Sequence, residues 1–339
     1  MNVPNSSLES PHFPVMLNEV IKICDPAEGG KYIDCTFGGG SYSNALLKFP
    51  NTQVVAMDRD KFVLKIAKKT KEKYLNRFSF HNEKFSNLDK IIDNDFKADA
   101  IIFDLGLSHF QLSDMSRGFS FKSRDKIDMN MGLASISAEK ILNNCDLENL
   151  KSIIKILGEE KEASKIAKNI VKERKIKKIS KVFELVKIIE KSKKKNYKKK
   201  INVCTKTFQA LRIFVNKEIT ELFEGVVKAT KLVKRGGKII IISFHSIEDK
   251  IIKFYFSNYS KNKSQPSRYF PTESKNQNIM FEAYRNKPIK ASIEEIQLNH
   301  PSRSAKLRFA IRNANEFKYP NNLKNKLRKI LDLENTNVK

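Results

Sequence analysis

Residues that bind metals or form disulfides are scarce in this sequence. Its 339 residues include four cysteines and five histidines. The histidines are dispersed, and no C-x-x-C pair occurs among the cysteines, which are Cys24, Cys35, Cys145 and Cys204. This spacing argues against a zinc site or a disulfide framework and is typical of free thiols in a reducing cytoplasm. We therefore expect no metal site and a cytoplasmic protein.

Long hydrophobic runs are missing as well. No apolar stretch reaches the roughly 18 residues that a membrane-spanning helix needs. Residues 1–14 also lack the charged-then-apolar pattern of a secretion signal. We expect no membrane partner, and the length suffices for one large domain or two smaller ones.

Acidic residues are too few to balance the basic ones. The 65 Lys and Arg residues exceed the 38 Asp and Glu residues and give a net charge of +27. Such an excess favours a polyanionic partner, with nucleic acid as the leading candidate. An AT-rich genome would produce the same bias, because Lys, Asn and Ile are abundant and Lys far exceeds Arg. Both explanations stay open at this point.

One glycine-rich stretch organises the rest of the chain. Residues 31–43 read KYIDCTFGGGSYS, an apolar run that ends in Asp34 and is followed by Gly38, Gly39 and Gly40. A strand, a glycine turn and a helix open a nucleotide-binding α/β unit. The spacing differs from the G-x-G-x-x-G pattern, which argues against a nicotinamide dehydrogenase. A glycine-rich turn without any ligand would have the same pattern.

Predicted strands alternate with predicted helices along the first hundred residues. Near-continuous apolar runs predict buried parallel strands at 31–35, 52–58, 78–81 and 98–104. Helical patterns precede and separate them at 16–23, 44–48 and 61–74. Three of the strands end in an acid, and these acids are Asp34, Asp58 and Asp104. Because parallel strands bring such ends to one edge of a sheet, we predict an α/β fold with its ligand site at that edge.

The remainder of the chain is less regular. After an irregular stretch at 105–132, periodicity predicts helices at 137–142, 147–157, 160–174 and 181–190. Next come a basic loop at 191–200, a long helix at 207–232 and a fifth strand at 238–243. A polar loop at 261–288 and a final antiparallel strand at 305–311 follow. The last strand is expected to pair near 289–293, and the basic tail contains a helix at 323–332. We predict a sheet domain at 12–133 and 205–314, an inserted helical substrate-recognition domain at 134–204, and a tail at 315–339.

The late antiparallel strand and the acid after the fourth strand favour a methyltransferase that uses S-adenosylmethionine. The sequence also resembles, from about residue 12 to residue 312, the RsmH (MraW) family of bacterial 16S rRNA (cytosine-N4)-methyltransferases. Seven blocks in the right order carry this resemblance: DCTFGGGSYS at 34–43, DLGLS at 104–108, QL at 111–112, RGFSF at 117–121, IDM at 127–129, TFQALRIFVN at 207–216 and ISFHSIED at 242–249.

The resemblance implies a fold, an activity and a set of contacts. The fold is a class I S-adenosylmethionine-dependent methyltransferase, Rossmann-like with a mostly parallel sheet and an antiparallel last strand, carrying an inserted all-helical domain. The activity is methylation of N4 of a decoding-site cytidine in helix 44 of 16S rRNA, within the small ribosomal subunit. The family's cofactor contacts fall on Gly40, Ser41, Tyr42, Asp58, Phe85, Asp104 and Gln111. The family usually has Gly-His where this chain has Ser41 and Tyr42, so a ring-nitrogen contact is lost there.

Cytosine N4 is a poor nucleophile because its lone pair is delocalised into the ring. An enzyme must align the amine with the methyl group and offer a hydrogen-bond acceptor. By position, the catalytic candidates are Asp104, Ser108 and His245. Asp104 would equally serve as a cofactor residue, and His245 as a helix-start residue held by the backbone. Phe121 and Phe244 are candidates to sandwich a flipped base, although core packing is the commoner use of Phe.

Other functions remain open from the sequence. One is an amino-methyltransferase that acts on DNA or protein. Another is a non-catalytic RNA-binding ribosome-assembly factor that retains the methyltransferase fold. The departures from the family pattern at Ser41 and Tyr42 are consistent with this hypothesis. Whether the protein is a monomer or a dimer is not indicated by any pattern in the sequence.

Overall fold

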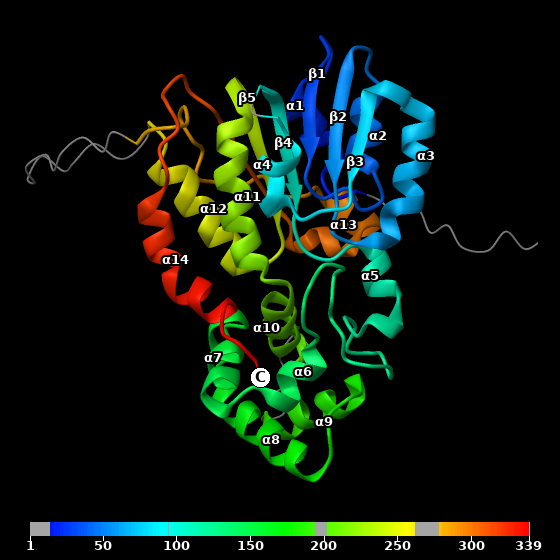
Figure 1. Ribbon diagram of the computed structural model, residues 1–339, viewed down its shortest axis with the longest axis vertical. Coiled ribbons are helices and arrows are strands. Elements are labelled where there is room, and N and C mark those ends of the chain that lie inside the picture. The colour runs from blue at the N-terminus through cyan, green and yellow to red at the C-terminus, as the bar shows by residue number, and fades with distance from the viewer. Residues whose placement is uncertain (1–13, 94, 194–201, 262–277, 339) are drawn as a thin grey trace, which may run out of the picture.

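A six-stranded sheet forms the centre of the protein, in the strand order β3-β2-β1-β4-β5-β6 (Figure 1). The computed structural model describes residues 14–93, 95–193, 202–261 and 278–338. The strands are β1 (Gly30–Asp34), β2 (Thr52–Met57), β3 (Phe78–His81), β4 (Ala98–Asp104), β5 (Val233–Ser243) and β6 (Lys306–Ile311). Neighbouring strands are parallel except β5 and β6, which are antiparallel. The predicted mostly parallel sheet with an antiparallel last strand is confirmed.

The apolar strands are buried on both faces. Successive strand residues point to opposite sides of a sheet, so Ile102 and Ile240 join one hydrophobic cluster while Ile101 and Ile241 join another. The first cluster includes α1 (Leu17–Cys24), α2 (Ser41–Leu47) and α3 (Leu64–Tyr74). The second includes α4 (Leu88–Ile91), α10 (Thr205–Asn216), α11 (Glu218–Leu232) and α12 (Ser246–Asn258). The sheet is therefore the middle of three layers.

The strand order places a site at one edge of this sheet. The chain moves outward from β1 to β2 and β3, and then returns to place β4 on the other side of β1. In open α/β sheets, ligands bind outside the carboxyl ends of the strands at such a reversal. Asp34 and Asp104, the last residues of β1 and β4, lie at this point.

A group of helices lies beyond the carboxyl edge of the sheet (Figure 1). It consists of α6 (Ala138–Asn144), α7 (Leu147–Leu157), α8 (Ala163–Ile176) and α9 (Val182–Ser192). Their buried residues belong to the same hydrophobic cluster as α10 and one face of the sheet. The four predicted helices are confirmed, and the domain boundaries proposed from the sequence stay a prediction.

The single helix predicted at 207–232 is wrong, because the chain turns in its middle. Lys217, between α10 and α11, has a left-handed backbone with φ of 50°. The preceding Asn216 donates a side-chain hydrogen bond to the Met129 carbonyl at 2.7 Å and accepts one from Met131 N at 2.9 Å. These contacts fix the end of α10 against a loop that is distant in sequence, so local periodicity gives no sign of the break.

Of two predictions near the C-terminus, one is confirmed and one needs correction. The last strand pairs near 289–293 as expected, through an isolated antiparallel bridge between Ile289 and Leu307, and along its length it pairs with β5. Residues 262–277 of the predicted polar loop and residues 194–200 of the basic loop lie outside the described residues. The end of the predicted polar loop is not a polar surface segment, because Met280 and Phe281 are fully buried. The predicted tail helix is confirmed as α14 (Asn321–Glu334). Two short helices, α5 (His109–Ser113) and α13 (Ile293–Leu298), lie near the carboxyl edge of the sheet.

Candidate functional site

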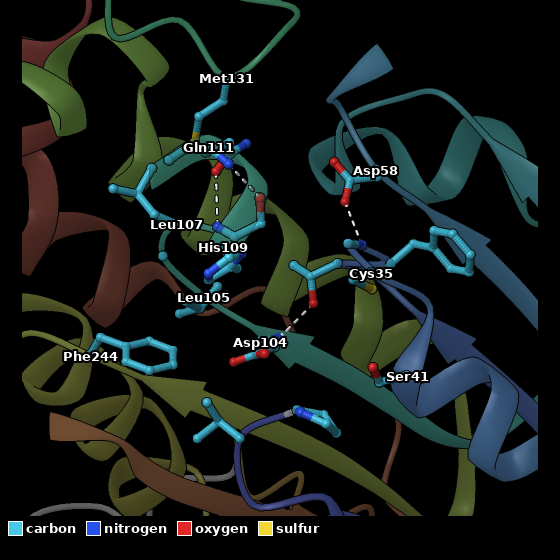
Figure 2. Close-up of a pocket in the computed structure, with 18 of the residues that line it drawn as sticks. Cys35, Ser41, Asp58, Asp104, Leu105, Leu107, His109, Gln111, Met131 and Phe244 are labelled. Atoms are coloured by element: carbon cyan, nitrogen blue, oxygen red, sulfur yellow. Dashed lines mark hydrogen bonds between the residues drawn. The ribbon is translucent and has the colours of Figure 1, made fainter. Parts of the chain in front are cut away.

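A pocket lies at the carboxyl edge of the sheet, where the strand order predicts a ligand. Its walls come from the turn after β1, the segments after β2, β3 and β4, the first turns of α11 and α12, and residues 14–15 and 298–301. Figure 2 shows Asp104 between the Phe244 ring on one side and Ser41 on the other. The structure brings together eight candidate site residues from the sequence: Ser41, Tyr42, Asp58, Phe85, Asp104, Ser108, Gln111 and Phe244.

The glycine turn is held against the end of β2 by Asp58. Gly38 N donates to Asp58 Oδ2 at 2.8 Å, and Asp60 N donates to Asp58 Oδ1 at 2.8 Å. Gly40 precedes α2 with φ of 76°, and a Cβ there would lie 2.7 Å from the Phe37 ring. Gly40 therefore shapes the turn from behind the pocket wall. Burial raises the pKa of Asp58 to about 6.

Asp104 and Tyr42 form a buried pair beneath the pocket. Tyr42 Oη lies 2.6 Å from the Val15 carbonyl and 3.2 Å from Asp104 Oδ2. Asp104 N donates to Thr36 Oγ1 at 2.7 Å, while Asp104 Oδ1 is buried and has no hydrogen-bond partner among the described residues. Burial is the main cause that raises the pKa of Asp104 to about 8. Tyr42 thus supports Asp104 by hydrogen bonding, which leaves one carboxyl oxygen for a ligand.

Ser108 and Gln111 are engaged mainly in holding α5. Ser108 Oγ accepts from Gln111 N at 3.2 Å, and Gln111 Oε1 accepts from Ser108 N at 3.0 Å, which is a capping box. Gln111 Nε2 donates to Asp60 Oδ2 at 2.8 Å, and Arg117 Nη1 donates to the same oxygen at 2.6 Å. This network joins α5 to the segment after β2, so the wall that carries Gln111 is fixed in place.

The charged pocket residues that the sequence did not single out include Arg59, Glu218 and Glu221. Arg59 Nη1 donates to the Asn216 carbonyl at 2.9 Å, but its Nε and Nη2 are buried without a partner among the described residues, as is Glu221 Oε2. Arg59 could have been predicted as a pocket residue from the sequence, because it directly follows Asp58 at the end of a predicted strand. The two glutamates could not, since they reach the pocket only because α11 starts anew after Lys217.

Phe85 is seated against α11. Its ring meets Phe103 edge-on at a centroid distance of 5.4 Å. A Cβ at Gly225 would lie 2.5 Å from the Phe85 ring, so the absence of a side chain at this position of α11 allows the ring to sit there. The same helix therefore presents two glutamates to the pocket and supports Phe85, one of the predicted cofactor contacts.

His245 and Phe121 do not reach the pocket wall. His245 caps α12, accepting from Glu248 N at 3.5 Å, and its Nε2 lies 3.1 Å from Glu248 Oε1. This is the backbone-held role that the sequence left as an alternative. Phe121 packs against Phe208 at a centroid distance of 6.2 Å, in the core. Of the two candidate base-stacking rings, Phe244 lines the pocket.

One cluster near the pocket has the donor types of a metal site. Glu218, His245 and Glu248 each bring one ligand atom to within 4.8 Å of the others. Glu218 is already held by Arg212, which donates to both of its carboxylate oxygens at 2.8 Å. A guanidinium that occupies both oxygens makes this an ion-pair network at the base of α11 and α12.

Sequence comparison decides the family. A model described as the MraW methylase family matches residues 9–313. The chain belongs to the MraW methylase family.

Relatives of this methylase carry a common name. A protein of Rickettsia typhi named ribosomal RNA small subunit methyltransferase H is 40% identical over 302 residues, which cover 88% of this chain and 97% of the relative. Proteins of the same name from Ehrlichia ruminantium and Zymomonas mobilis are 38% and 36% identical, and the matches cover 88% and 92% of this chain and 98% and 94% of those relatives. A solved structure described as an rRNA methylase from Streptococcus thermophilus, 10% identical, matches 86% of this chain and 92% of that one with a TM-score of only 0.38.

The residues of the pocket fit S-adenosylmethionine, the methyl donor of this MraW methylase. The cofactor carries a carboxylate, two cationic groups, two ribose hydroxyls and an adenine. The pocket offers nitrogens of Arg59 and oxygens of Asp104 and Glu221 that have no partner among the described residues, so cofactor groups of either charge can be paired here. Buried polar groups of native proteins are rarely left unpaired, which is consistent with a ligand that satisfies them. Among the described residues, no helix is long and apolar enough to cross a bilayer.

Proposed function

We propose that this methyltransferase methylates N4 of a decoding-site cytidine in helix 44 of 16S rRNA, within the small ribosomal subunit. The names of the relatives support ribosomal RNA as the substrate class. The net charge of +27 is consistent with a polyanionic partner. The structural observation that carries the amine chemistry is the buried, unpaired Asp104 Oδ1 in the pocket. A substrate of this kind implies a cytoplasmic enzyme.

The cofactor would be held by both walls of the pocket. Asp58 would accept hydrogen bonds from the ribose hydroxyls, and Phe85 would pack against the adenine. Ser41, at the start of α2, and the turn that Gly40 shapes would hold the methionine end. Arg59 would pair with the cofactor carboxylate, with Gln111 supporting the wall next to it. When bound, S-adenosylmethionine supplies a methyl group activated by a sulfonium.

Asp104 would act on the amine. Its Oδ1 accepts a hydrogen bond from N4 and orients the nitrogen toward the methyl group. As the N–C bond forms, positive charge builds on N4, and an ionised Asp104 stabilises that charge in a site shielded from water. The proton then leaves N4 for the carboxylate or for water. Since burial raises the pKa of Asp104 to about 8, the ionised fraction and the rate rise with pH through that value.

Phe244 would stack on the cytosine. Its half-buried ring lies beside Gly106, where a Cβ would be 3.2 Å from the ring, and it faces the same pocket as Asp104. A base that is methylated on its amine must leave the helical stack, and an aromatic face offsets part of the lost stacking. Ser108 lines the same pocket, and its hydroxyl, which accepts from Gln111 N, would also contact the base.

The test is methylation of small ribosomal subunits that lack the modification, using S-adenosylmethionine labelled in its methyl group. We expect label on N4 of the decoding-site cytidine, a loss of about 100-fold in rate for Asp104→Asn, and a loss of about 10-fold for Phe244→Ala. Phe121→Ala is the matched control, since that ring packs in the core. Label on another nucleotide, or on protein, would refute the proposed target.

Two binding measurements separate the remaining alternatives. Calorimetry should show that the protein binds S-adenosylmethionine; a protein that binds rRNA but not the cofactor would instead be an assembly factor. Affinity for rRNA should fall steeply between 50 and 200 mM salt if the excess of lysines contacts phosphates. A flat response would mean that genome composition explains the charge.

A further inference from the structure

The C-terminal helix α14 lies beyond residues 9–313, the part of the chain that matches the MraW methylase family. It packs against α11 and α7 (Figure 1). Its last residue, Glu334, is 1% exposed although it is an acid. We infer that Glu334 is a positioning residue for the pocket, acting through the first turn of α11.

Glu334 supplies the N-terminal cap that α11 lacks locally. Glu334 Oε1 accepts from Ile219 N at 3.1 Å, and Oε2 accepts from Thr220 N at 2.8 Å and from Thr220 Oγ1 at 2.6 Å. The first N–H groups of a helix need acceptors from outside the helix, and the residue before the helix usually provides one. Here that residue is Lys217, whose side chain makes no capping bond and instead donates to Asn335 Oδ1 at 2.8 Å.

The turn that Glu334 caps carries part of the pocket. Glu218 and Glu221 project from it into the pocket, and Glu221 also lies 3.8 Å from Lys84. Two residues before α11 begins, Asn216 holds Met131, another pocket residue, while its own carbonyl accepts from Arg59. The start of α11 is thus the point where several pocket residues converge, and a carboxylate from the far end of the chain holds it in place.

Docking of α14 does not depend on Glu334 alone. Leu323, Leu327 and Leu333 of this helix are buried in the main hydrophobic cluster. These contacts should keep the helix in place when the carboxylate is removed. Substitution of Glu334 is therefore expected to change the geometry of the first turn of α11 while the fold persists.

The experiment uses the full chain and measures the Kd for S-adenosylmethionine by calorimetry, well below the melting temperature. Glu334→Ala should raise the Kd by about 10-fold. The matched control is Asp332→Ala, because Asp332 is on the same helix, is 73% exposed at its side chain, and among the described residues forms an ion pair with Arg328 alone, at 3.8 Å. The control should stay within twofold of the wild type.

A second comparison identifies the route of the effect. Thr220→Ala removes one of the donors to Glu334, so Glu334→Ala should raise the Kd less in that background than in the wild type. A lowered melting temperature with an unchanged Kd would mean a structural role only and would overturn the inference. If Glu334→Ala does not fold, Glu334→Gln is measured instead. This substitution keeps the shape of the side chain but turns one acceptor into a donor, and it should raise the Kd by about threefold or more. The result does not depend on which nucleotide is methylated, because it requires only that the wild type binds the cofactor.

Discussion

The two walls of the pocket are built in different ways. One wall consists of acids at or just after the ends of parallel strands, chiefly Asp58 and Asp104, whose places follow from the sheet. The other consists of Glu218 and Glu221 on the first turn of α11, whose places depend on a break at Lys217. The first wall is fixed by backbone hydrogen bonds between neighbouring strands, and the second by side chains from segments far apart in sequence. Loss of a residue should therefore have different consequences in each wall.

The largest expected effect is on the strand-edge wall, through Asp58. Asp58→Ala leaves the Gly38 and Asp60 N–H groups without their acceptor and removes the proposed ribose contact. Hydrogen bonds to a charged group contribute about 1.5–3 kcal/mol each. We expect the Kd for S-adenosylmethionine to rise about 100-fold, which is ~2.7 kcal/mol, in a calorimetric titration.

Glu221→Ala is the comparator from the helical wall. We expect it to raise the Kd for S-adenosylmethionine by about 10-fold, because Glu221 Oε2 has no partner among the described residues and is free to pair with the cofactor. Equal effects of the two substitutions would mean that the two walls contribute alike. An Asp58→Ala protein with wild-type affinity would refute the ribose assignment.

The next effect is the contribution of acids at the strand ends to the dependence of stability on pH, beside that of Glu334, whose pKa burial raises to about 7. Burial raises the pKa of Asp104 to about 8 and those of Asp34 and Asp58 to about 6. The folded state then keeps protons that the unfolded state releases above about pH 4. The free energy of unfolding therefore falls as the pH rises toward and through the pKa values of the folded state. For Asp104, one retained proton corresponds to ~1.4 kcal/mol per pH unit, or roughly 2 kcal/mol between pH 6 and 8.

Urea denaturation of the wild type and of Asp104→Asn across this range would measure the difference. The variant should lose less stability than the wild type, because it has no proton to release at this position. Parallel curves for the two proteins would place the titrating group elsewhere.

The strand-edge wall was also the part of the site that could be predicted. Asp58 and Asp104 follow apolar runs whose length and composition predict buried parallel strands, and such strands fix where their ends lie. The break at Lys217 could not be predicted, since it rests on contacts of Asn216 with residues 129–131. Glu334 could not be predicted for the same reason, because its partners are 114 and 115 positions away. Sequence patterns report local periodicity, whereas the helical wall is set by long-range hydrogen bonds.

An effect of similar size concerns two of the three glycines of the turn, Gly38 and Gly40. Gly40→Ala places a Cβ 2.7 Å from the Phe37 ring in a backbone with φ of 76°, so a buried ring has to move. Overpacking and left-handed strain each cost about 1–3 kcal/mol, and we expect a loss of about 2 kcal/mol in thermal or urea denaturation. Gly38→Ala is the matched control: its Cβ would meet nothing closer than Thr36 O at 3.8 Å, so only the strain remains. A larger loss for Gly38→Ala would show that the turn is limited by backbone conformation and not by packing.

The smallest effect tests whether Tyr42 belongs to the pocket or to the core. Its ring is 3% exposed and its hydroxyl lies against Val15 and Asp104. Tyr42→Phe keeps the ring and removes the hydroxyl, which should lower the free energy of unfolding by about 1 kcal/mol and leave the cofactor Kd within about threefold. Urea denaturation and calorimetry of the same variant measure both quantities. A large loss of affinity without loss of stability would instead make Tyr42 a direct cofactor contact, and the strand-edge wall would then extend to α2.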